Sequence, residues 1–177
     1  MKTYQIAIIG VGKISQDQHL PVIARDKRFK LAAVVSQRGL PQPGVPTFRT
    51  PAELYAALPD LDAVAICTPP HVRHALAREA LDAGKQVLLE KPPAPTMAEM
   101  HDLTAYAAAR ERVIFATWHS RYNEGVDLAK KLLAGRKIRF LISSGRKMCA
   151  AGIPVRNGSG TQAISACSIL ASTRCRS

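Results

Sequence analysis

The segment GVGKIS at residues 10–15 is the first place in the chain where residue types and spacing indicate chemistry. It directly follows an apolar run, as a phosphate-binding turn between a strand and a helix does. Gly10 would permit a tight turn, and Gly12 would let the backbone approach a pyrophosphate at the start of the next helix. Ser15 stands where the full fingerprint has a third glycine, so we expect slightly less close packing of helix and strand. The segment predicts dinucleotide binding, and the alternative is a merely tight turn.

The end of the second apolar run bears on which dinucleotide would bind. A carboxylate usually accepts hydrogen bonds from the ribose of NAD at this point. The residues here are instead Ser36, Gln37 and Arg38. A hydroxyl and a guanidinium can contact a 2′-phosphate, so NADP is favoured or at least tolerated. The alternative is that Arg38 is one more solvated loop charge.

A parallel sheet covered by helices would place these residues correctly. Short apolar runs alternate with longer amphipathic ones as far as about Thr117, which is the pattern of such a fold. The predicted class is therefore α/β, with a doubly wound parallel sheet of the Rossmann type. The expected strands, rich in Val, Ile, Ala and Leu, cover residues 5–10, 31–36, 63–67, 86–90 and 113–117.

Capping residues mark the expected helix ends. The segments TPAE at 50–53 and TMAE at 96–99 both fit the capping box, so a helix should begin at each. Glycine suits the left-handed cap at the end of a helix. On that ground, two more helices are expected over residues 72–83 and 124–134, ending at Gly84 and Gly135.

The segment CTPPHVRHALAREALDAGKQVLLEKPP at 67–93 resembles the glucose-fructose oxidoreductase, inositol dehydrogenase and MocA family. The resemblance combines the glycine turn, the TPP loop, the helix ending in AGK and the EKP motif, with intervals that also fit. GKISQDQHLP and ATWHSR further resemble the galactose and L-arabinose 1-dehydrogenases, which oxidise the anomeric carbon of an aldose to a lactone. The resemblance to the family covers about residues 1–139 and implies an NAD(P)-dependent oxidoreductase with a small aldose as substrate.

The resemblance implies a set of cofactor contacts. Thr68, Pro69 and Pro70 would form the loop over which the cofactor passes, with His71 next to it. The motif of Glu90, Lys91 and Pro92 would lie beside the nicotinamide ribose. Contacts from the glycine turn and from the end of the second strand complete the expected set: Gly10, Gly12, Lys13, Ile14, Ser36, Gln37 and Arg38.

Lys91 is the expected catalytic residue. The resemblance implies that it holds both the cofactor ribose and the sugar hydroxyls, and that its charge helps to set the proton affinity of the reacting group. The alternative is a lysine at an exposed strand end. Trp118 and His119 would line the sugar pocket, the indole packing on a pyranose and the imidazole bonding a hydroxyl.

The remaining histidines and the cysteines give weaker signals. His19, His74 and His101 fall within or beside predicted helices and are expected to be satisfied surface or core histidines. The four cysteines lack metal-ligand spacing, so we expect free thiols and no metal site.

The net charge of +12 is concentrated in the C-terminal part of the chain. All thirteen Asp and Glu lie at or before Asp127 with fifteen of the 25 Lys and Arg, whereas ten Lys and Arg and no acid follow. The basic residues form no stripe at helical spacing and are not regularly interleaved with aromatic residues, so nucleic acid is not an expected partner. No long apolar run or signal peptide is evident, which predicts a cytoplasmic protein without membrane contact.

The sequence loses its periodicity after about Phe140. The genetic code permits only certain codons for residues 145–160. If the codon of Ser144 ends in T, suitable permitted codons read one base out of phase give WKEDVRRWHPGQEWIW and, further along, FDPGINAL. Both of these shifted sequences resemble family sequence. We therefore expect a cofactor domain over 1–120, the start of a substrate and dimerisation domain over 121–139, and an out-of-frame, disordered tail over 140–177. The second, α+β domain would be truncated and the family's dimer interface largely missing.

Three functions remain open from the sequence. The first is a truncated aldose 1-dehydrogenase that retains cofactor binding but has weak or no catalysis, because neither the general base nor a closed pocket is encoded. The second is a nucleotide-binding or sensor module without chemistry. The third is a nucleic-acid-associated protein with a basic tail.

Overall fold

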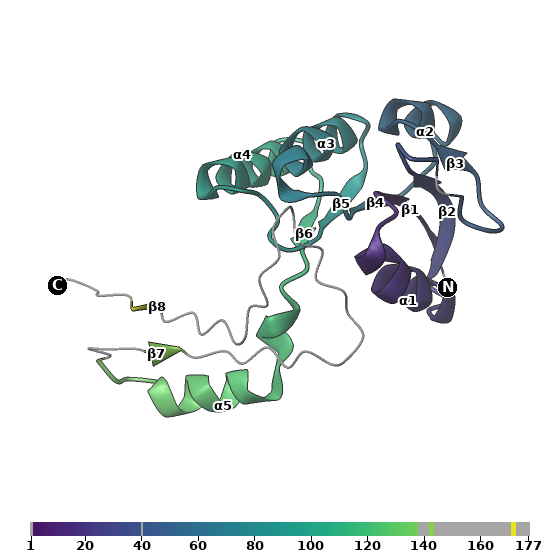
Figure 1. Ribbon diagram of the computed structural model, residues 1–177. Helices are drawn as coiled ribbons and strands as arrows, with labels where there is room; N and C mark the ends of the chain where they lie inside the picture. The colour runs from purple at the N-terminus through teal and green to yellow at the C-terminus, as the bar shows by residue number, and fades with distance from the viewer. Residues whose placement is uncertain (1, 40, 138–141, 144–170, 173–177) are drawn as a thin grey trace, which may run out of the picture. The chain divides into compact units, whose positions relative to one another are not determined.

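The computed structural model describes residues 2–39, 41–137, 142–143 and 171–172 (Figure 1). The chain forms two compact units, Met1–Asn123 and Glu124–Ser177. The second unit contains helix α5 (Glu124–Leu133) and the short antiparallel pair β7 (Ile142–Ser143) and β8 (Ala171–Ser172). The predicted disorder of the tail lies outside the described residues, apart from those two strands.

The first unit is built on a parallel sheet, which confirms the predicted fold class. Its strand order is β3-β2-β1-β4-β5-β6. The five predicted strands are present, whereas β3 was not predicted because a two-residue edge strand has no apolar run. The strands are β1 (Tyr4–Ile9), β2 (Phe29–Val35), β3 (Thr47–Phe48), β4 (Ala63–Ile66), β5 (Gln86–Leu89) and β6 (Ile114–Ala116).

The described residues of the first unit form four α-helices, and a π-helix and a 3-10 helix flank them in the chain. In both predicted capping boxes the threonine hydroxyl accepts from the backbone of the glutamate three residues later, and the glutamate side chain accepts in return. Gly84 has φ +74°, as its predicted capping role requires. The helices are η1 (Ser15–His19, π), α1 (Leu20–Arg25), α2 (Pro51–Ala57), α3 (Pro70–Asp82), α4 (Met97–Ala108) and η2 (His119–Tyr122, 3-10).

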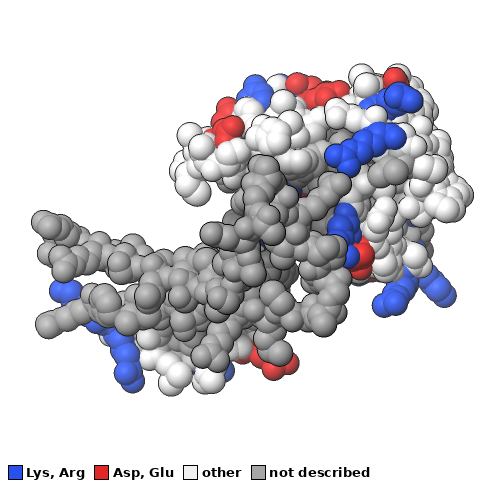
Figure 2. Space-filling view, viewed as in Figure 1, with Lys and Arg blue, Asp and Glu red and all other residues white. Residues whose placement is uncertain are grey.

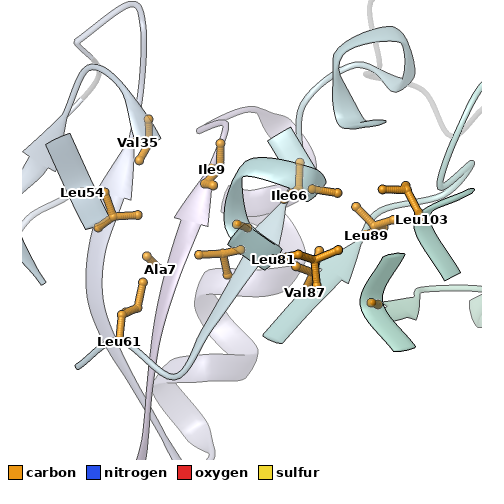
Figure 3. Packing of buried hydrophobic residues seen from close by; sticks show 14 of the residues in the cluster. Ala7, Ile9, Val35, Leu54, Leu61, Ile66, Leu81, Val87, Leu89 and Leu103 are labelled. Carbon is orange, nitrogen blue, oxygen red and sulfur yellow. The ribbon is translucent and has the colours of Figure 1, made fainter. Parts of the chain in front are cut away.

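The main hydrophobic core lies between the sheet and helices α2, α3 and α4 (Figure 3). Leu54 of α2, Leu81 of α3 and Leu103 of α4 are fully or almost fully buried there. Strands β1, β2, β4 and β5 contribute alternate side chains to this face, as a period of two requires. On the opposite face a smaller cluster forms around Ile8 of β1 and Ile23 of α1.

Helix α1 covers only part of its face of the sheet. In Figure 1, α1 lies on the opposite side of the strands from α3 and α4. On that side a cavity opens over β4 and β5, and its lining also includes residues of η1 and α1. Strand β1 pairs with β2 on one side and with β4 on the other. The crevice where ligands bind in such sheets therefore lies at the carboxyl ends of β1 and β4.

Candidate cofactor and substrate site

The glycine turn fits closely against the loop that follows β4. Gly10 has φ +96°, and a Cβ on it would lie 2.9 Å from Thr68 Cγ2 and 3.0 Å from Thr68 N. A side chain at this position would therefore be both strained and obstructed. A Cβ on Gly12 would meet no described atom within 4 Å, so the backbone there faces open space.

Ser15 closes this turn in place of the third glycine. Its hydroxyl accepts a hydrogen bond from Gly12 N–H at 2.9 Å and donates one to Gly12 O at 2.7 Å. The side chain is fully buried. Both hydrogen bonds of the buried Ser15 hydroxyl are thus made inside the turn, where the next helix starts beside the sheet.

A cavity of about 720 Å³, which we call the nucleotide pocket, lies beside the glycine turn and the carboxyl ends of β2 and β4. It brings together most of the residues that were expected to contact the cofactor. From that set, its lining includes Gly10, Gly12, Ser36, Gln37, Arg38, Thr68, Pro69 and His71.

The hydroxyl of Thr68 bears on whether a polar ligand fits this pocket. Its Oγ1 is buried and has no hydrogen-bond partner among the described residues. Leaving a buried hydroxyl unpaired is costly. A ligand with polar oxygens, such as a dinucleotide, fits the pocket because it would supply the missing partner.

Arg49 also lines the nucleotide pocket, and the sequence reasoning missed it. A Cβ on Gly39 would lie 4.0 Å from Arg49 Nη2, so the guanidinium reaches the loop that carries Arg38. The Arg49 N–H donates to Glu53 Oε2 at 2.9 Å, which anchors the backbone at the start of α2. The described lining residues of this pocket include two arginines and no carboxylate.

A second cavity, of about 790 Å³, lies on the open face of β4 and β5, and we call it the sheet-face cavity. Apolar strand residues form its floor. At the carboxyl ends of β5 and β6 it is lined by Glu90, Lys91, Thr117 and His119. Ile14, two residues after Gly12, lines this cavity and not the nucleotide pocket. The glycine turn therefore lies between the two cavities.

Glu90 is the buried acid of the sheet-face cavity. Its Oε1 lies 2.9 Å from His19 Nε2, and its Oε2 accepts from Lys91 N–H at 3.0 Å. Burial raises the pKa of Glu90, but the hydrogen bonds from His19 and from the Lys91 N–H lower it, and the pKa lies below its ordinary value. Glu90 is therefore an ionised acceptor at neutral pH and not a proton donor.

Arg73, on α3, joins the two loops that the sequence motifs identified. Its guanidinium donates to Thr68 O at 2.8 Å and also to Glu90 O and Pro92 O. The residue is 5% exposed. Sequence reasoning did not single it out, although an arginine on the buried face of a helix is itself a signal of a structural role.

Some of the predicted residues lie away from both cavities. Trp118 is 52% exposed and lines neither cavity. Lys13 is exposed and pairs with Asp17 at 2.6 Å. Pro70 is the first residue of α3. The carbonyl of Pro92 accepts a hydrogen bond from the Arg73 guanidinium.

The other residues with reactive groups have structural surroundings. His74 Nε2 lies 2.7 Å from Asp102 Oδ2, and His101 is exposed. Cys67 is a free thiol, and burial raises its pKa to about 12. Within the described residues no group of His, Cys, Asp and Glu could hold a metal ion.

The surface adds two observations. On the face that Figure 2 shows, the described Lys and Arg side chains lie in separate groups among neutral and acidic ones. In the part of the chain that the structure describes, no helix has the length and apolar character needed to cross a bilayer.

Comparisons with known proteins agree with this geometry. The chain is 46% identical to galactose 1-dehydrogenase of Pseudomonas fluorescens over 99 residues, which are 56% of this chain and 32% of that protein. It is 30% identical to the uncharacterized oxidoreductase YhhX of Escherichia coli over 142 residues, which are 77% of this chain and 41% of that protein. The chain thus spans less than half the length of these relatives.

Solved structures give the same result. D-galactose-1-dehydrogenase from Rhizobium etli superposes with a TM-score of 0.71 at 46% identity, covering 78% of this chain and 45% of that one. A 3-ketoreductase variant from Actinomadura kijaniata, in complex with TDP-benzene and NADP, has a TM-score of 0.65 at 22% identity and covers 75% and 44%. The latter likeness concerns the fold alone.

The family itself follows from a match over most of the first unit. The model for an oxidoreductase family with an NAD-binding Rossmann fold matches residues 4–118. This match confirms the resemblance noted in the sequence. With its parallel sheet, its glycine turn and its two cavities at the strand ends, the chain belongs to the Gfo/Idh/MocA family of oxidoreductases.

Proposed function

We propose that this chain binds NADP(H) and forms the cofactor half of an aldose 1-dehydrogenase acting on galactose or L-arabinose. The observation that supports this most is the arrangement of the two cavities on either side of one glycine turn. Gly12 lines the nucleotide pocket and Ile14 lines the sheet-face cavity, two residues further along. An extended dinucleotide that crosses the turn would reach both cavities.

The two arginines support NADP as the cofactor. Arg38 and Arg49 would hold a 2′-phosphate at the adenosine end. A guanidinium can donate two parallel hydrogen bonds to the oxygens of one phosphate. The lining residues that the structure describes offer no carboxylate to repel this phosphate. Gly10 and Gly12 would let the pyrophosphate approach the backbone, and Thr68 Oγ1 would gain its missing partner.

Lys91 and His119 would act on the sugar in the sheet-face cavity. Bound NADP supplies the hydride acceptor for oxidation of the anomeric carbon to the lactone. The Lys91 ammonium would donate hydrogen bonds to the ribose and to a sugar hydroxyl, and would stabilise negative charge that develops on that oxygen. The imidazole of His119 would hold a further hydroxyl and so orient the ring.

The chain as it stands should catalyse this reaction weakly. Among the described residues that line the sheet-face cavity, Glu90 is the acid, and both of its oxygens already have partners. A general base contributes about 10²–10⁴-fold to the rate of such reactions. We therefore expect turnover reduced by about that factor relative to an enzyme with a base in place.

Aldose-dependent reduction of NADP by the purified chain tests the substrate. We expect slow, saturable formation of NADPH with galactose or L-arabinose, and none in a Lys91→Ala variant. A variant at the exposed His101, such as His101→Gln, should match the wild type. If NADPH binds but neither sugar is oxidised, the chain is a nucleotide-binding module without this chemistry, which was the second function left open by the sequence.

A further inference from the structure

His19 and Glu90 form a buried pair that the proposed reaction does not use. They lie 71 positions apart in the chain, with Nε2 and Oε1 separated by 2.9 Å. Their side chains are 15% and 9% exposed. Because a carboxylate only accepts hydrogen bonds, His19 donates through Nε2–H.

The pair has a direct connection to Lys91. The second carboxylate oxygen of Glu90 accepts from the Lys91 N–H at 3.0 Å. One carboxylate thus joins the end of η1 to the backbone of the lysine. On the main-chain side, Arg73 donates to Glu90 O and Pro92 O, which holds the residues on either side of Lys91.

The carboxylate depends on these donors because it is buried. A buried charge with too few hydrogen bonds is costly and tends to move toward water or to become protonated. Without His19, the hydrogen bond from the Lys91 N–H remains on the carboxylate among the described residues, since the Thr117 hydroxyl donates to Leu89 O at 3.2 Å. Loss of His19 would therefore allow the carboxylate to leave Lys91.

A π-helix also sets His19 apart from an ordinary surface histidine. Residues Ser15–His19 form η1, and His19 is its last residue. Such turns are rare and occur frequently at functional sites. His19 and Lys91 both line the sheet-face cavity, together with His119.

We propose that His19 is a positioning residue, whose hydrogen bond to Glu90 fixes the backbone of Lys91 and so directs the Lys91 ammonium into the sheet-face cavity. The effect on the bound cofactor rests on the proposed function. The effect on the Lys91 backbone does not, and it can be measured without any ligand.

Three variants of the full chain separate this role from general stability. His19→Leu removes the donor at similar volume, and His19→Gln keeps an N–H donor at a similar reach. His74→Leu is the matched control, because it breaks a histidine–carboxylate bond of 2.7 Å that lies away from both cavities.

Amide hydrogen exchange is the first measurement. Exchange is followed residue by residue by NMR, in which the Lys91 amide gives its own signal and Pro92 and Pro93 give none, because they have no N–H. We expect exchange at Lys91 to rise roughly tenfold in His19→Leu, as for loss of one hydrogen bond to a charged group. It should stay near the wild-type rate in His19→Gln and His74→Leu. Unchanged exchange in His19→Leu would overturn the proposal.

NADPH affinity, measured by nicotinamide fluorescence, is the second measurement. We expect His19→Leu to weaken binding roughly tenfold in the wild-type background. In a Lys91→Ala background the same substitution should change affinity by less than about twofold, because the two residues act together. An equal loss in both backgrounds would mean that His19 does not act through Lys91. If the wild-type chain binds no NADPH, the proposed function fails, while the exchange experiment still decides whether His19 holds Lys91.

Discussion

Arg38 and Arg49 are the residues on which the proposed preference for NADP depends. A guanidinium that bonds the 2′-phosphate contributes to binding of NADPH but not of NADH. We expect Arg38→Ala and Arg49→Ala each to weaken NADPH binding roughly tenfold and to leave NADH affinity within about twofold. Arg25→Ala, at an exposed position outside both cavities, is the matched control. Fluorescence titration with both nucleotides measures the ratio, and equal losses for NADPH and NADH would contradict a phosphate contact.

Glu90 should make the stability of the first unit depend on pH. Its folded-state pKa lies below the ordinary value of 4.5, so its ionised form adds stability above that value. The contribution is lost as the pH falls through the lowered pKa. We expect Glu90→Gln to lower the free energy of unfolding most at pH above 4.5, with the difference from wild type shrinking toward acid. Urea unfolding over a pH series measures this, and a constant difference across the series would contradict it.

The residues of the site differ in how visible they are in the sequence. The glycine turn, Ser36 and Thr68 follow apolar runs, and the strand ends of one parallel sheet bring such residues together. Arg49, Arg73 and His19 could not be found in this way. Arg73 and His19 reach Glu90 from 17 and 71 positions away, and Arg49 joins the nucleotide pocket because β3 pairs with β2. These contacts depend on how distant elements pack, which local pattern does not specify.

At the level of elements, the capping boxes make the sharpest stability prediction. Thr96→Ala removes the hydroxyl that accepts from Glu99 N–H at 3.2 Å, so it should lower the free energy of unfolding by about 1 kcal/mol. Thr50→Ala at the start of α2 should cost a similar amount. Thr104→Ala, in the middle of α4 with its hydroxyl bonded to Met100 O, is the control and should change stability by less than about 0.5 kcal/mol. Equal effects at Thr96 and Thr104 would mean that capping is not the cause.

The elements also show where pattern reasoning succeeds. Five strands, two capped helix starts and the glycine end of α3 were predicted because each has a local signal of period or cap. Helix α3 begins at Pro70, two positions before the predicted start, since proline is well suited to a first turn. Strand β3 and the π-helical form of η1 have no such signal, because backbone pairing and packing in the folded sheet determine them.

For the whole molecule, the C-terminal composition leads to a prediction about the coding DNA. We propose that residues from about 140 onward are read out of frame, since a one-base shift with permitted codons gives family-like sequence. The DNA should then continue in the shifted frame into further family-like sequence without an early stop. A stop codon or unrelated residues in that frame would remove the proposal, and the excess of ten basic residues after Asp127 would need another explanation.

The sheet-face cavity should also affect how the whole molecule behaves in solution. The floor of the sheet-face cavity is apolar, and two apolar side chains of its lining, Ile14 and Val22, are 36% and 59% exposed. Exposed apolar surface of this kind favours association and dye binding. The purified chain should therefore bind a hydrophobic dye, and addition of NADPH should reduce that signal if the nicotinamide end enters the cavity.

Titration of the full chain with NADPH, followed by nicotinamide fluorescence with NADH in parallel, tests the central claim most directly. A chain that holds the dinucleotide across its glycine turn should show saturable binding with a changed emission, tighter for NADPH than for NADH. Binding should be weakened by Gly12→Val, whose side chain would occupy the open space that faces the pocket. Absence of saturable binding by either nucleotide to the folded chain would contradict the account.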